Sequence, residues 1–139
     1  MKAVVDTNVI AYYLLGTPDF AAETQAFWRS AGELLAPSLW EAELANVVWM
    51  AVRTGGVTKD EGARKLHLAG RLGVQSVGMR ALWQAALARA LESSIPVYDT
   101  LFVELAARER LPLATFDGRL LTTYAAVAKR PKELLEGRP

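Results

Sequence analysis

The sequence has no cysteine and a single histidine, His67, among its 139 residues. Without cysteine, a thiol nucleophile, a thiolate zinc site and a disulfide framework are all excluded. With one histidine, neither a His-Glu-x-x-His zinc motif nor a pair of histidines for acid–base ribonuclease chemistry can form. A glycine-rich phosphate loop ending in Lys-Ser/Thr is also missing. If the protein is an enzyme, carboxylates and a bound metal are the leading way to run its chemistry.

Long apolar runs are missing as well. The longest uncharged stretch, 7–18, contains polar residues and is shorter than the roughly 20 apolar residues that span a bilayer. Asp6 interrupts the first apolar run too early for a signal peptide. We therefore expect a cytoplasmic protein without membrane association. A hydrophobic content of 52% favours one folded domain, 1–139, over a disordered chain.

The charge of the chain is nearly balanced, at a net +1 from 16 basic and 15 acidic residues. If four acids are held in a metal site, the remaining surface carries an excess of five basic residues. Such an excess suits a polyanionic partner, and an ordinary mixed surface explains it equally well. Arg29, Arg53, Arg64 and Arg71 could line a phosphate-binding rim, but nothing separates them from ordinary surface arginines.

Short apolar runs alternate with helical periodicity along the chain, which predicts an α/β fold with a mainly parallel sheet. Ser38-Leu39-Trp40-Glu41 and Thr58-Lys59-Asp60-Glu61 have the pattern of capping boxes that open helices. The residues after 125 give no clear pattern. The expected strands are 2–5, 34–36, 74–77, 95–98 and 113–116, and the expected helices are 8–15, 18–31, 38–53, 58–72, 80–92, 99–110 and 118–124.

Three of the expected strands end in an aspartate: Asp6, Asp99 and Asp117. The carboxyl ends of parallel strands meet at one edge of a sheet, where ligands bind in open α/β folds. We therefore predict a pocket of negative charge, which a hard divalent cation would fill. Taken singly, Asp6 and Asp99 are equally well explained as helix caps, and Asp117 as part of an Asp-Gly turn.

Glu43 is the fourth candidate acid. It lies two residues after Glu41, so the two side chains project about 200° apart on a helix. Glu41 is assigned to the start of that helix, whereas Glu43 lies beside apolar Leu44, where a partly buried carboxylate needs a partner. Exposure of Glu43 on the rim is the alternative. Thr7 and Asn8 follow Asp6 and could orient its carboxylate or hold a water.

Together these residues resemble a PIN domain. The matching motifs are Val-Val-Asp-Thr-Asn-Val at 4–9, Glu-Leu-Ala-Asn-Val-Val at 43–48, Tyr-Asp-Thr-Leu-Phe at 98–102 and Ala-Thr-Phe-Asp-Gly-Arg-Leu at 114–120. The resemblance implies a three-layer αβα fold with a short, mainly parallel sheet. It also implies that Mg²⁺ or Mn²⁺ is held by Asp6, Glu43, Asp99 and Asp117, with Thr7, Asn8 and Thr115 as accessory polar residues, for the cleavage of RNA.

A free-standing domain of this length is similar to the VapC-type toxins of toxin–antitoxin pairs. That similarity implies a homodimer whose endoribonuclease activity is blocked by a small cognate antitoxin. Two other functions remain open: a PIN-like module that binds RNA or protein without cutting, and an RNA-maturation nuclease without an antitoxin. An aspartate phosphotransferase of the dehalogenase type fits less well, because the second aspartate of that motif is replaced by Asn8.

Overall fold

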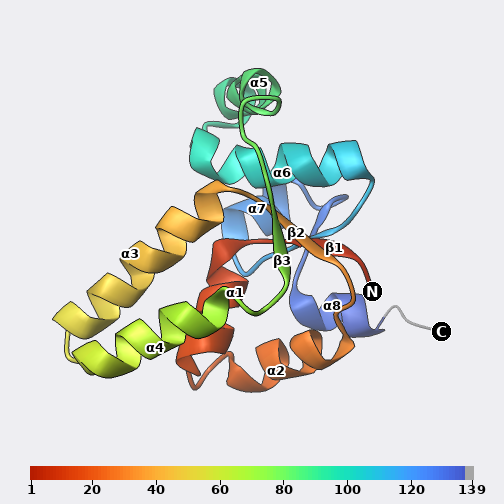
Figure 1. Ribbon diagram of the computed structural model, residues 1–139. Coiled ribbons are helices and arrows are strands. Elements are labelled where there is room, and N and C mark those ends of the chain that lie inside the picture. The colour runs from red at the N-terminus through yellow and green to blue at the C-terminus, as the bar shows by residue number, and fades with distance from the viewer. Residues whose placement is uncertain (137–139) are drawn as a thin grey trace.

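The computed structural model describes residues 1–136, which form a five-stranded, all-parallel sheet (Figure 1). The strands are β1 (Ala3–Val5), β2 (Leu34–Pro37), β3 (Val74–Val77), β4 (Leu113–Ala114) and β5 (Ala128–Lys129). Their order across the sheet is β3-β2-β1-β4-β5. All four strand pairs are parallel, which requires that helical crossovers connect them.

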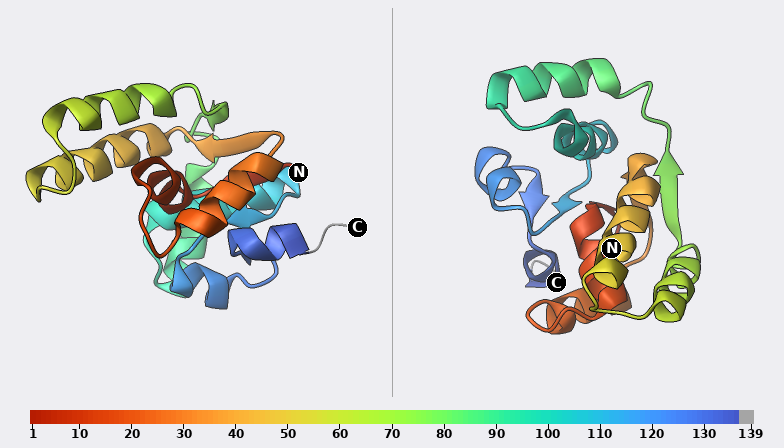
Figure 2. Two further views of the ribbon diagram at one scale, coloured as in Figure 1. Left: turned by 90° about the horizontal axis from the view of Figure 1, so that it is seen from below. Right: turned by 90° about the vertical axis from the view of Figure 1, so that its left-hand side faces the viewer.

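Eight helices cover both faces of the sheet, so the predicted three-layer αβα fold is confirmed (Figures 1 and 2). Helices α5 and α6 lie on one face, and α1, α2 and α8 lie on the other. Helices α3 and α4 pack side by side and project from one side of the molecule. The helices are α1 (Thr7–Leu15), α2 (Ala21–Ser30), α3 (Leu39–Arg53), α4 (Lys59–Ala69), α5 (Trp83–Ser93), α6 (Val97–Glu109), α7 (Gly118–Thr123) and α8 (Pro131–Glu136).

The core forms where these layers meet the sheet. Both β1 and β2 are buried along their whole length, as expected for central strands covered on both faces. Helix α6 is buried on nearly all sides from Thr100 to Ala106, because it runs between the sheet and α5. The largest fully buried apolar side chains include Ile10, Phe27, Leu44, Phe102, Leu105, Leu113 and Leu120. This core fixes the carboxyl ends of β1 and β4.

The strand order reverses at β1. The chain moves from β1 to β2 and β3 on one side, and then returns to place β4 and β5 on the other. In open α/β sheets the crevice beyond the carboxyl ends of strands at such a switch point is the usual binding site. Here the switch point lies between β1 and β4, whose residues Val5 and Ala114 are register partners. Asp6 follows the first of these strands.

One expected strand is absent. Residues 95–98 were predicted to be a strand, but Ile95 and Pro96 form the turn before α6, which begins at Val97. Proline has no N–H to donate to a strand ladder, and its fixed φ suits a helix start. The Pro96 carbonyl accepts hydrogen bonds from the amides of Asp99 and Thr100. Asp99 therefore lies in the first turn of a helix and not at the end of a strand.

One of the two predicted capping boxes is wrong and the other is confirmed in part. Ser38 already has helical dihedral angles and its side chain caps nothing, while the Glu41 carboxylate accepts a hydrogen bond from Ser76 of β3 at 2.9 Å. Glu41 therefore binds Ser76, which is distant in sequence, and not the start of its own helix. The Thr58 hydroxyl does accept the Glu61 amide, at 3.1 Å, and opens α4 as predicted.

The end of the chain is ordered structure where the sequence gave no clear pattern. β5 extends the sheet next to β4, and α8 packs against α2. An ion pair of 2.6 Å joins Arg130 to Glu23 across this contact. The predicted single domain, 1–139, includes three residues, 137–139, that lie outside the described part of the chain. Within residues 1–136, no helix combines the length and apolar character that a bilayer crossing requires.

Candidate active site

Asp6 is the most buried acid of the site, with 6% of its surface exposed. Its backbone amide bonds the Ala114 carbonyl of β4 at 2.9 Å, which fixes the residue directly beyond β1. One carboxylate oxygen, Oδ1, accepts the Thr7 amide at 2.8 Å, so Asp6 does cap α1. The other oxygen, Oδ2, accepts the Thr115 hydroxyl at 2.7 Å. Capping and a place in the site are therefore compatible.

Burial raises the pKa of Asp6 from 3.8 to about 7. The hydrogen bond from Thr115 opposes this rise, and the negative charges of Asp99 and Glu43 add to it. Asp6 thus has donors for its carboxylate but no cation in contact among residues 1–136. A buried carboxylate surrounded by like charge is the situation that a bound divalent cation relieves.

Glu43 reaches the same place from α3. Its Oε1 accepts the hydroxyl of Thr7 at 2.8 Å, although 36 residues separate the two in sequence. The side chain is half-buried, and burial raises its pKa, with the Thr7 hydrogen bond opposing and the Asp99 charge reinforcing that rise. The alternative of full exposure on the rim is not what the structure shows. Glu41, two residues earlier, points to β3 instead.

Asp99 is held in the first turn of α6 and is also half-buried. Within residues 1–136 its carboxylate accepts no hydrogen bond and forms no ion pair. Burial raises its pKa, the charge of Asp117 raises it further, and the charge of Arg119 lowers it. The capping explanation of this residue fails, because the N-cap of α6 is Pro96.

Asp117 caps α7, so the predicted turn role is replaced by helix capping. Its Oδ1 accepts the amides of Arg119 at 2.9 Å and Leu120 at 3.2 Å. Its own amide donates to the Thr115 hydroxyl at 3.0 Å, which ties it to the end of β4. Its charge acts on Asp99. Asp6, Glu43, Asp99 and Asp117 are called the acid cluster below.

Thr115 and Asn8 connect the two strand ends. The Thr115 hydroxyl lies between Asp6 and the Asp117 amide and is fully buried. The Asn8 side chain accepts the Phe116 amide at 3.2 Å through Oδ1, and its Nδ2 lies 3.4 Å from Asp6 Oδ2. All three predicted accessory residues, including Thr7, therefore contact an acid of the cluster or a strand end that carries one. These contacts position the carboxylates of Asp6 and Glu43.

We expect Thr115→Val to destabilise the protein by about 1–3 kcal/mol, because it strips a donor from buried Asp6 and an acceptor from the Asp117 amide. Valine has nearly the same shape as threonine, so packing is preserved. Urea unfolding in EDTA measures the loss. Thr115→Ser is the matched control and should stay within about 1 kcal/mol of the wild type, because it keeps the hydroxyl. Equal stabilities for the valine and serine variants would contradict this role.

The donor set of the acid cluster fits Mg²⁺ or Mn²⁺. Carboxylate oxygens are hard ligands, and Mg²⁺ keeps several of its waters while binding to few carboxylates directly. Among residues 1–136, no three His, Asp or Glu side chains lie close enough together to hold an ion directly. With this spacing, an ion would have to be held partly through its waters.

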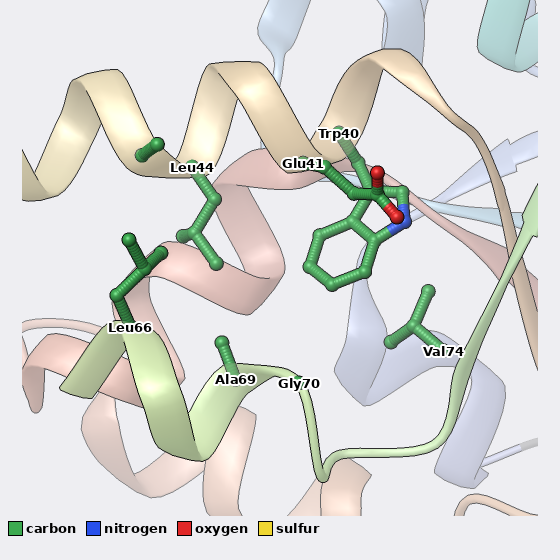
Figure 3. Close-up of a pocket in the computed structure, with 8 residues that line it drawn as sticks. Trp40, Glu41, Leu44, Leu66, Ala69, Gly70 and Val74 are labelled. Atoms are coloured by element: carbon green, nitrogen blue, oxygen red, sulfur yellow. The ribbon is translucent and has the colours of Figure 1, made fainter. Parts of the chain in front are cut away.

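The cavity shown in Figure 3 is separate from the acid cluster. It has a volume of about 380 Å³ and lies between α3, α4 and β3. Glu41 is its one acid, and the Trp40 indole N–H donates to Ser76 Oγ at 2.8 Å beside it. The other lining residues are mainly apolar, among them Leu44, Leu66, Ala69 and Val74. It offers packing surface and lacks the converging polar groups of a catalytic site.

One contact beside the site was not predicted from the sequence. Arg119 donates through Nη2 to the Ser94 carbonyl at 2.6 Å, beside Asp99 and Asp117. Neither residue was singled out, since the four arginines considered above lie elsewhere. The Arg that follows Asp-Gly at 117–118 was the available clue. His67, set aside as a catalytic group, is exposed on α4.

The chain is similar in sequence to known proteins. The PIN domain profile matches residues 3–126. Ribonuclease VapC3 from Pyrobaculum aerophilum is 31% identical over 132 residues, which span 91% of this chain and 98% of that relative.

Three solved structures share the fold. The PAE2754 protein of Pyrobaculum aerophilum has a TM-score of 0.77 at 20% identity, over 98% of this chain and 88% of that one. A toxin–antitoxin complex from Klebsiella pneumoniae has a TM-score of 0.63 at 16% identity, over 93% and 97% of the two chains. VapBC2 from Rickettsia felis, bound to a DNA fragment from its promoter, has a TM-score of 0.65 at 16% identity, over 94% and 98%.

Proposed function

Since the chain belongs to the PIN domain family, we propose that it is a metal-dependent endoribonuclease and the toxin of a toxin–antitoxin pair. The proposal assigns Asp6, Glu43, Asp99 and Asp117 to the binding of Mg²⁺ or Mn²⁺ and to catalysis. Thr7, Asn8 and Thr115 are assigned to positioning those carboxylates. The substrate is RNA in the cytoplasm, where a toxin of this kind would act.

The main observation that supports the proposal is the partial burial of Asp99 among other carboxylates. Asp99 is a half-buried carboxylate near other carboxylates, and within residues 1–136 it has no hydrogen-bond or ion-pair partner. Its burial has a cost that the hydrophobic effect does not repay at an acidic side chain. Such an arrangement is expected where function requires it, since strongly perturbed acids cluster at active sites.

In this proposal, the residues around the acid cluster have different positioning roles. Thr115 and the Thr7 amide orient the Asp6 carboxylate, the Thr7 hydroxyl orients Glu43, and the first turn of α7 orients Asp117. When bound, the ion supplies the Lewis acidity that in-line attack of water on a phosphodiester requires. The expected products carry a 5′-phosphate and a 3′-hydroxyl.

The partners of the proposed toxin are a small antitoxin protein and a second copy of the chain. Two solved structures with the same fold are assemblies of toxin and antitoxin, which supports the first. Large apolar side chains exposed on the surface support protein contacts in general, and two of the four tryptophans are about half-exposed. These exposed side chains include Trp49, Met50, Leu68, Trp83, Leu87 and Leu91.

Incubation of the purified protein with RNA in Mg²⁺ or Mn²⁺ and in EDTA tests the proposed activity. We expect fragments in either metal and intact RNA in EDTA, because the ion supplies the Lewis acidity that the attack of water requires. A PIN-like module that only binds RNA would retain the substrate without metal-dependent products, and that result would refute the nuclease assignment. A small open reading frame directly upstream of the gene would support the antitoxin, and an isolated gene would favour an RNA-maturation nuclease.

A further inference from the structure

The acid cluster creates an electrostatic problem for any RNA substrate. The four carboxylates lie within electrostatic reach of one another, and one divalent ion neutralises only part of their charge. Phosphates on either side of the cleaved bond need cations from the protein itself. A suitable cation must lie beside the cluster, be exposed to solvent and not be neutralised by another acid.

Arg119 meets these conditions. It lies two residues after Asp117 in the first turn of α7, and its side chain is exposed. Its guanidinium donates to the backbone carbonyl of Ser94 at 2.6 Å, and within residues 1–136 it forms no ion pair. A carbonyl is a neutral acceptor, so the full positive charge remains. The Arg119 backbone amide donates to Asp117 Oδ1 at 2.9 Å, which places the residue beside the cluster, and its charge acts on Asp99.

The Ser94 carbonyl that accepts from Arg119 belongs to a turn that other hydrogen bonds stabilise. Ser94 ends α5 with φ of 61°, in the left-handed region that non-glycine residues seldom occupy. The preceding Ser93 hydroxyl accepts the Ile95 amide at 3.2 Å and donates to the Arg89 carbonyl at 2.7 Å. These contacts fix the direction of the Ser94 carbonyl. The guanidinium therefore has a positioned acceptor beside the cluster before any substrate arrives.

Several other arginines have their charges committed elsewhere. Arg89 and Arg108 both bind the carboxylate of Glu104, at 2.9 and 2.7 Å, and Arg130 binds Glu23. The Arg89 pair joins α5 to α6, the Arg108 pair lies within α6, and the Arg130 pair joins α2 to the chain after β5. Arg119 differs because its anchor leaves the remaining N–H groups available, and a guanidinium with two parallel N–H groups is the side chain best shaped for a phosphate.

We propose that Arg119 binds a backbone phosphate of the RNA substrate beside the acid cluster, and that the Ser94 carbonyl positions its guanidinium. The identity of the polyanion as RNA rests on the proposed function. The binding step itself does not depend on cleavage. Arg119 is thus a substrate-binding residue, and Ser94 is a positioning residue that acts through its backbone.

The experiment measures the binding of a fluorescein-labelled single-stranded RNA to the Asp99→Asn protein in Mg²⁺, by anisotropy, over a series of NaCl concentrations. Adding Arg119→Ala should weaken binding about 10- to 100-fold at low salt, the usual value of a charged hydrogen-bonding contact. The slope of log affinity against log salt should fall in magnitude by about 0.7, the share of one phosphate on single-stranded nucleic acid. Arg119→Lys should keep most of that slope, since it keeps the charge.

Arg110→Ala, tested in the same Asp99→Asn protein, is the matched control. Arg110 is exposed at the C-terminal end of α6, whereas Asp99 lies in the first turn of that helix, so affinity and salt slope should not change. A merely structural role of Arg119 would lower the melting temperature without changing the slope. An unchanged affinity and slope for Arg119→Ala, or no RNA binding by the Asp99→Asn protein, would overturn the inference. Cleavage by the wild type is scored separately, so failure of the nuclease assignment is distinguishable.

Discussion

Asp99→Asn is expected to reduce RNA cleavage in Mg²⁺ by about a thousand-fold while the protein remains folded, because a carboxylate that supports a catalytic ion contributes several kcal/mol. The fold should survive because the Asp99 carboxylate makes no hydrogen bond or ion pair within residues 1–136 that asparagine would break. Initial rates on one RNA at saturating Mg²⁺ measure the loss. The same substitution removes a repulsive charge, so stability in EDTA should rise.

Glu41→Gln is the matched control for this prediction. Glu41 lies on α3 two residues before Glu43, but its carboxylate binds Ser76 and lies outside the acid cluster. Glutamine keeps an acceptor for that contact, so the cleavage rate should stay within about two-fold of the wild type. Wild-type cleavage by Asp99→Asn would remove Asp99 from the catalytic set.

The second large effect is a loss of stability as pH rises in the absence of metal. In the unfolded chain Asp6 ionises near 3.8, whereas burial and neighbouring carboxylates raise its pKa to about 7 in the folded protein. Between these pH values the folded state binds a proton that the unfolded state has lost, so the free energy of unfolding falls as pH rises. The full difference corresponds to about 4 kcal/mol, and it levels off above pH 7. Glu43 and Asp99 act in the same direction.

Glu104 does not interfere with this measurement. Burial alone would raise its pKa, but hydrogen bonds from Arg108 and Arg89 lower it overall. The stability that it contributes is therefore present above pH 4.5 and is lost only as pH falls below that value. The window from about pH 5 to 7.5 reports mainly the acid cluster.

Urea unfolding at several pH values in EDTA and in Mg²⁺ tests the pH effect. Mg²⁺ should flatten the decline, since it stabilises the ionised carboxylates. Asp6→Asn should flatten it in EDTA, whatever its effect on absolute stability. Asp60→Asn, on the exposed first turn of α4, should leave the slope unchanged. A stability that rises with pH across this window in EDTA would show that the acids are not crowded as described.

Local sequence signals located much of the site. At Asp6, the apolar run followed by an acid correctly predicted a strand, a helix cap and a helix. The prediction succeeded because these three features are neighbours in sequence. Helical geometry separated Glu43 from Glu41 correctly, since both lie on one helix and its period is fixed. The strand that ends before Asp117 is also present, although β4 is only two residues long.

The errors arose where a partner distant in sequence decides the conformation. Glu41 turns to Ser76 and not to the start of its own helix, and the contact joins residues 35 apart. The strand expected at 95–98 is an exception, because there the deciding residue is local: Pro96 is the N-cap of α6. β5 is two residues long, too short for any periodic pattern, and is made by pairing with β4. The Arg119–Ser94 contact joins residues 25 apart in sequence, so no local pattern predicts it.

The end groups of the RNA fragments test the central claim, that the acid cluster cuts RNA through a bound metal, most directly. RNA cleaved by the wild-type protein in Mg²⁺ should carry 5′-phosphate and 3′-hydroxyl ends, and EDTA should abolish these ends. Sequencing that captures only 5′-phosphorylated fragments detects them, with the Asp99→Asn protein as the blank. Fragments with 2′,3′-cyclic phosphate and 5′-hydroxyl ends that persist in EDTA would contradict the claim, because they come from attack by the RNA 2′-hydroxyl and require no metal.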